Sequence, residues 1–255
     1  MKAKRSVKGV ALFASAMTAC VAILGGAQPA AAVTPDPGTA LSAAQTAYEM
    51  WKRYKGQDDL SVATREIVNA VGAARDDINA HIEAVDATGV RSCALAAMFD
   101  VPDMPNMTQD TLQDFARDTT RCVTDATVKI DEMTAKGVVD ELGFALHTLA
   151  PIALVAREKS GFSTSQLEAE IARSSNVLLQ KLKPACYVNK AGDDRPPTPG
   201  YEVVVNCYAY NGDKGTDYQF ISPTKPVSYT KAKLEAQRNT SDMLAREALR
   251  EGTLN

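Results

Sequence analysis

The chain has 255 residues, with 28 basic and 31 acidic side chains and a net charge of −3. Its basic residues are scattered among acidic ones instead of forming a stripe, which argues against a nucleic-acid-binding protein. The length is enough for one large domain, or one domain with a small appendage, and such a chain buries a core without needing covalent staples.

The first 32 residues have the order of a secretory signal peptide. The basic residues that open it are Lys2, Lys4, Arg5 and Lys8. An apolar stretch follows over residues 10–24, and three alanines after Pro29 form a cleavage site. We predict that residues 1–32 are removed and that the mature chain is secreted. It then carries 24 basic and 31 acidic side chains, a net charge of about −7, because every lost charge is positive.

Cysteine usage agrees with export into an oxidising compartment. Cys20 lies in the apolar part of the leader, where a lipid anchor is a minor alternative to cleavage after Ala32. The four cysteines of the mature chain are Cys93, Cys122, Cys186 and Cys207. Four cysteines allow three pairings. We predict Cys93–Cys122 and Cys186–Cys207, because each pair flanks one local unit. No Cys-x-x-Cys motif occurs, so we expect no metal or cofactor.

Helical periodicity extends over residues 40–183, which we predict to form a bundle of about five helices. Residues 33–39 contain two prolines and no periodicity, and are predicted as an exposed leader. Residues 59–85 are predicted as one helix of about 40 Å. Residues 99–107 contain two prolines and are predicted as a loop, with only a short helical turn before it.

The most apolar segment of the mature chain is 142–155, which has no charged side chain. Apolar residues on all sides are typical of the central helix of a bundle, which Pro151 is expected to kink or divide. The alternative is an element that inserts into membranes, although a straight span needs about 20 residues. The residues that would enter the membrane are Leu142, Phe144, Leu146, Leu149, Ile152 and Leu154.

Both histidines have a structural and a functional interpretation. His147 is the only titratable side chain of segment 142–155, and we favour a hydrogen-bonded core residue over a pH switch. His81 lies four residues after Asp77 on a predicted helix, so the two share a face. A surface contact is favoured there, because a metal site needs a third ligand that the sequence does not indicate.

After Pro184 the apolar period changes from helical to about two. Residues 184–227 are predicted to contain a β-hairpin closed by the second disulfide, and residues 228–255 a C-terminal helix with a thin apolar stripe. The expected fold class is therefore mainly α: a helical bundle of about five helices, a small disulfide-closed β-hairpin unit and a C-terminal helix.

Tyrosines are concentrated in the hairpin unit, which holds five of the eight in the chain. These five are Tyr187, Tyr201, Tyr208, Tyr210 and Tyr218. Tyrosine provides contact area at low entropic cost, so we predict a binding surface. Ordinary packing of the sheet against the bundle explains the same residues and stays open as the alternative.

No catalytic motif is evident: the chain has no Gly-x-Ser-x-Gly elbow, and no phosphate-binding glycine loop follows a strand. We therefore expect an exported, noncatalytic interaction protein that uses the hairpin unit and the loop at 99–107, with a protein or surface ligand still unknown. The alternatives are a membrane-active or pore-forming toxin component that uses 142–155, and a secreted hydrolase without a readable site. The alanine-rich leader and bundle are typical of bacterial proteins.

Overall fold

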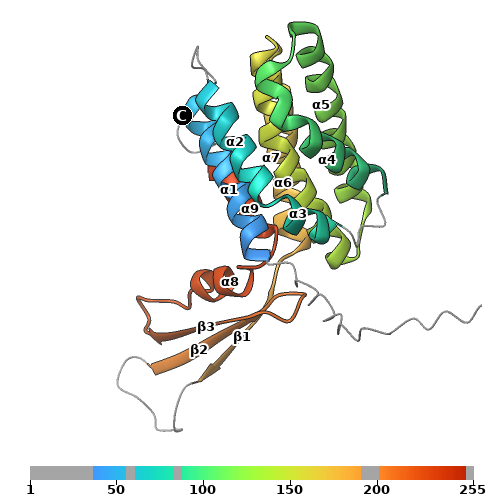
Figure 1. Ribbon diagram of the computed structural model, residues 1–255. Coiled ribbons are helices and arrows are strands. Elements are labelled where there is room, and N and C mark those ends of the chain that lie inside the picture. The colour runs from blue at the N-terminus through green and yellow to red at the C-terminus, as the bar shows by residue number, and fades with distance from the viewer. Residues whose placement is uncertain (1–36, 56–60, 83–87, 191–200, 251–255) are drawn as a thin grey trace, which may run out of the picture. The chain divides into compact units, whose positions relative to one another are not determined.

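The computed structural model describes residues 37–55, 61–82, 88–190 and 201–250. Within them the chain is mainly helical, with a small antiparallel sheet and C-terminal helices, as the sequence predicts (Figure 1). The predicted signal peptide, with Cys20, lies outside the described residues.

Helices occupy almost all of the described chain before the sheet. They are α1 (Pro37–Tyr54), α2 (Ser61–Ala73), α3 (Arg75–Ile82), α4 (Thr88–Asp100), the 3-10 helix η1 (Val101–Asn106), α5 (Gln109–Glu132), α6 (Lys136–Lys159) and α7 (Ser165–Lys181). The predicted long helix over 59–85 is wrong, because α2 ends at Ala73 and α3 begins at Arg75. Gly72 lowers helix propensity beside this break.

Residues 88–106 are more regular than the sequence indicates. The predicted short turn is the full helix α4, and the predicted loop is largely η1. Pro102 stands in the first turn of η1, where a missing N–H costs nothing, so proline is compatible with helical structure there.

Helix α6 is the centre of the helical core and packs against α5, α1 and α7. Pro151 lies inside it without dividing it. The helix ends at Lys159, and Gly161, two residues further on, has a φ of +81° that suits glycine. There the Phe162 N–H donates to the Arg157 carbonyl oxygen at 2.8 Å and closes the final turn.

Both predicted disulfides are confirmed. Cys93–Cys122 joins α4 to α5, with a Cα–Cα distance of 5.6 Å. Cys186–Cys207 joins two paired strands, with a Cα–Cα distance of 4.1 Å. Two disulfides indicate that the chain folds in an oxidising compartment.

The sheet has three antiparallel strands in the order β1 (Ala185–Lys190), β2 (Tyr201–Tyr208) and β3 (Lys214–Ile221). The β2–β3 turn contains Gly212, whose φ is +89°.

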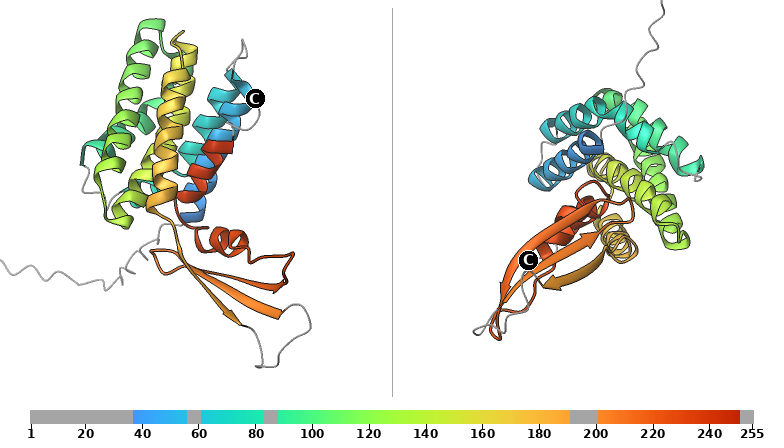
Figure 2. Two further views of the ribbon diagram at one scale, coloured as in Figure 1. Left: turned by 180° about the vertical axis from the view of Figure 1, so that it is seen from behind. Right: turned by 90° about the horizontal axis from the view of Figure 1, so that it is seen from below.

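The predicted single C-terminal helix is two helices, α8 (Thr230–Ala236) and α9 (Asp242–Leu249). The break contains Asn239, Thr240 and Ser241, whose side chains favour turns over helix interiors. Helix α8 packs on β3 and β2, whereas α9 packs beside α7 and α1 (Figure 2).

Candidate functional site

The sheet has one covered face and one open face. Side chains alternate between the two faces along each strand, so the register assigns every residue to a side. The buried residues of β2 are Val203, Val205 and Cys207, and they define the face that α8 covers. A Cβ added at Gly215 would clash with the Ala232 carbonyl oxygen, so α8 lies directly against the backbone of β3.

The other side, which we call the open face, carries four aromatic side chains. Their exposed fractions are 76% for Tyr218, 61% for Tyr187, 54% for Phe220 and 42% for Tyr208. They come from all three strands, and half-buried Val204 lies between them, directly paired with Tyr218. The open face therefore presents aromatic side chains from every strand on a regular backbone.

Few charges interrupt this surface. Glu202 lies opposite Phe220, and Lys214 lies opposite Tyr208 with its Nζ 5.8 Å from the centre of that ring. The Thr216 hydroxyl donates to the Asn206 amide oxygen at 3.0 Å, so two of the polar groups between the rings satisfy each other. The open face can accept an apolar partner without stripping water from a cluster of charges.

The structure brings three of the five predicted tyrosines together and separates two. Tyr187, Tyr208 and Tyr218 share the open face, and the Tyr187 and Tyr208 rings are 6.3 Å apart. Tyr201 falls on the covered side of β2, because it is an odd number of residues from Tyr208. Phe220 also belongs to the open face, but it was not among the residues predicted from the sequence. Because it lies two residues after Tyr218 on the same strand, strand periodicity could have predicted that the two share a face.

Tyr210 has a structural position instead of a place on the open face. Its hydroxyl donates to the Asp140 carboxylate at 2.6 Å, and burial followed by the Asp140 charge raises its pKa above the usual 10. The same carboxylate accepts from the Ser241 N–H at 2.6 Å and from the Ser241 hydroxyl at 2.7 Å. Asp140 thus ties α6 to the segment after β2 and to the start of α9.

The close approach of α6 to Ser241 requires Gly143. A Cβ at Gly143 would clash with Ser241 Oγ and would lie 2.8 Å from its Cβ. The glycine therefore lets the Ser241 hydroxyl reach Asp140, one turn earlier on α6.

The six large apolar residues predicted as a membrane element are all core residues here, none more than 2% exposed. By length and composition α6 would suffice to cross a bilayer, but 89% of its most apolar window is buried in the protein. An apolar helix that is buried in this way is typical of the centre of a helical bundle.

His147 is fully buried in α6, and its Nδ1 lies 2.9 Å from the Tyr48 hydroxyl. Burial lowers its pKa to about 3, so the folded protein holds a neutral imidazole at any physiological pH. The side chain of His81 lies outside the described part of the chain, so its contact with Asp77 stays a prediction. Across the described ranges, no three His, Cys, Asp or Glu side chains gather into a metal-binding group.

Comparisons with protein-family models, with curated proteins and with solved structures found no match for this chain.

Proposed function

We propose that the chain is a secreted, noncatalytic interaction protein that binds a protein partner through the open face of its sheet. The observation that carries the proposal is four aromatic side chains, 42–76% exposed, on one face of a sheet whose other face is covered. Export is supported by the leader-like residues 1–32 and by the two disulfides.

The size of the aromatic surface supports a protein partner. With about 200 Å² for each ring, the exposed fractions amount to roughly 450 Å². Apolar patches of this size on a monomer often mark interaction sites. It is about half of the roughly 800 Å² that each partner contributes to a standard interface, so a polar rim would supply the rest.

The composition of the face supports the same proposal. Aromatic residues are enriched and charges depleted at the centres of protein interfaces. Lys214 and Glu202 lie beside the rings, one of each sign, and do not favour a strongly charged ligand.

The rigidity of the face lowers the entropic cost of binding. The Cys186–Cys207 disulfide fixes β1 to β2, and α8 supports β2 and β3 from the covered side. The tyrosines and Phe220 are thus presented by a backbone that needs no ordering when the partner arrives.

The test compares three forms of mature protein (33–255) as bait for secreted and cell-surface proteins of the producing cells. One form is wild type, one carries Tyr187→Ser with Tyr218→Ser, and the matched control carries Tyr229→Ser, an exposed tyrosine outside the strands. Each retained protein is identified, purified and titrated against all three baits.

We expect one partner that binds wild type and the Tyr229→Ser control equally. The double variant should bind it about 10- to 100-fold more weakly, since an interface hot spot contributes about 1–2 kcal/mol or more. Equal binding by all three baits, or no retained protein, would overturn the proposal. Circular dichroism confirms that each bait is folded.

A further inference from the structure

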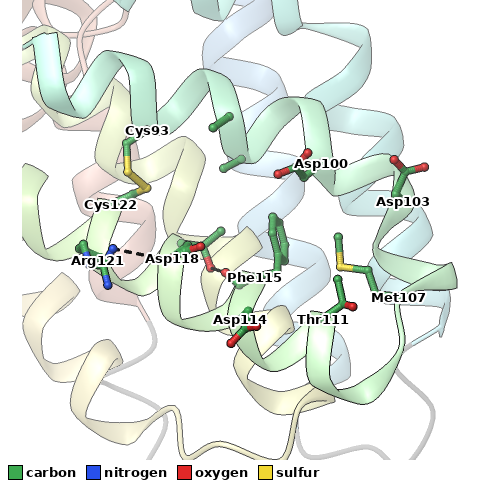
Figure 3. A pocket seen from close by; sticks show the side chains of 13 residues that line it. Cys93, Asp100, Asp103, Met107, Thr111, Asp114, Phe115, Asp118, Arg121 and Cys122 are labelled. Atoms are coloured by element: carbon green, nitrogen blue, oxygen red, sulfur yellow. Dashed lines mark hydrogen bonds and ion pairs between the residues drawn. A yellow bond between two sulfur atoms is a disulfide. The ribbon is translucent and has the colours of Figure 1, made fainter.

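A groove of about 650 Å³ lies between the α4–η1 segment and α5, far along the chain from the sheet (Figure 3). Its volume falls within the 300–1,000 Å³ of typical small-molecule sites. The groove is thus the size of a small ligand and too small to hold a folded partner.

The floor of the groove is apolar. Phe115 of α5 lies in the middle of the floor with 7% exposure, and Met107 closes one end. Ala97 of α4, with 4% exposure, also lines the groove. Met107 is flexible and polarisable, and so adapts to the shape of a ligand. The Cys93–Cys122 disulfide closes the other end and holds α4 to α5, so the walls are fixed before a ligand binds.

The rim of the groove is acidic. Asp114 pairs with Arg117 at 2.9 Å, and Asp118 pairs with Arg121 at 3.5 Å, both on the exposed surface of α5. The carboxylates on the opposite wall are Asp100 and Asp103. Neither has an ion pair or a side-chain hydrogen bond among the described residues. Two of the four rim aspartates are thus paired with arginines, and the excess negative charge of the rim lies at Asp100 and Asp103, where it attracts positive charge.

We propose that this groove binds a small organic cation with an apolar body. The cationic group lies at the wall formed by Asp100 and Asp103, and the apolar body covers Phe115 and Met107. A carboxylate attracts an ammonium group, and the apolar floor favours the burial of the apolar body. Anionic ligands are repelled by the same wall. The inference is independent of the proposed function, because the groove and the open face share no residue.

The test uses three probes of one shape that differ in charge: 4-phenylbutylamine, 4-phenyl-1-butanol and 4-phenylbutyrate. Binding to the mature, oxidised protein is measured by calorimetry and by saturation-transfer NMR. We expect the amine to bind most tightly, the alcohol more weakly and the carboxylate least. Added salt should weaken binding of the amine and leave binding of the alcohol unchanged.

Two sets of variants separate the contribution of the aspartates to binding from that of the apolar floor. Asp100→Asn with Asp103→Asn should weaken binding of the amine about four- to tenfold, since each exposed ion pair contributes up to about 1 kcal/mol. The same change should leave the alcohol unaffected, and Asp125→Asn, an exposed carboxylate of α5 outside the groove, should affect neither. Ala96→Trp, at an exposed lining position, should fill the groove and abolish binding of both probes.

The open-face double variant (Tyr187→Ser with Tyr218→Ser) should bind the amine as wild type does, which distinguishes failure here from failure of the proposed function. Three results would overturn the inference. They are no amine binding up to its solubility limit, equal binding of all three probes, and amine binding that survives Ala96→Trp.

Discussion

Acid should destabilise this protein through His147. The folded state keeps its pKa at about 3 because the imidazole is fully buried, whereas an unfolded chain has the ordinary value of 6.5. Below pH 6.5 the unfolded state therefore binds a proton that the folded state does not. The free energy of unfolding falls as the pH drops from 6.5 towards 3.

The loss of unfolding free energy follows from how far the pH lies below the pKa of histidine in the unfolded chain. At pH 5 the histidine is 1.5 units below 6.5, and one unit corresponds to about 1.36 kcal/mol, so the loss is about 2 kcal/mol. Urea unfolding at pH 7, 6 and 5 measures it. The matched variant is His147→Asn, whose amide oxygen can take the place of Nδ1 beside the Tyr48 hydroxyl.

The two proteins are compared by how steeply the free energy of unfolding changes with pH. Its absolute value is not compared, because the substitution changes it at every pH. His81 and the carboxylates are common to both proteins and cancel in the difference. Wild type should lose about 2 kcal/mol more than His147→Asn between pH 7 and pH 5. Equal slopes in the two proteins would refute the assignment of a buried, neutral imidazole.

Further predictions test the contacts and the burial of α6, with Gly72 of α2 as a control. Tyr210→Phe removes one hydrogen bond to the buried Asp140 carboxylate and should lower the free energy of urea unfolding by about 1.5–3 kcal/mol. Gly143→Ala should lower the free energy of unfolding by about 1–3 kcal/mol in the same assay, because the added methyl group meets Ser241. Gly72→Ala should raise it by about 0.5–1 kcal/mol, because the space around Gly72 is open and alanine favours the helix. Because α6 is a core helix, dye-loaded vesicles of mixed lipids should stay intact at pH 7 and pH 5; leakage abolished by a folded Leu149→Lys variant would instead support the membrane-active alternative.

Local patterns were sufficient for much of the fold. The uncharged run around His147 predicted a central helix, and sequence proximity predicted both disulfides. Each of these features depends on residues within about 30 positions of one another. The break between α2 and α3 was missed because the apolar stripe continues across it, through the buried residues Val71, Ala74 and Ile78.

The candidate site was only partly predictable, for a geometric reason. The sequence grouped five tyrosines, but β-strand alternation and register decide which share a face, and Tyr201 falls on the other side from Tyr208. The bond between Tyr210 and Asp140 joins residues 70 positions apart, beyond any local pattern. The groove needs the packing of the full helix α4 on α5, whereas the sequence predicted only a short helical turn before the loop at 99–107.

Site-specific photo-crosslinking tests the central claim most directly. A benzoyl-phenylalanine replaces Tyr218 in one form of the secreted protein and Tyr229 in another, and both are irradiated in cultures of the producing cells. The open-face account predicts a discrete adduct with one protein from position 218 and none from position 229. No adduct from position 218, or the same adducts from both positions, would contradict it.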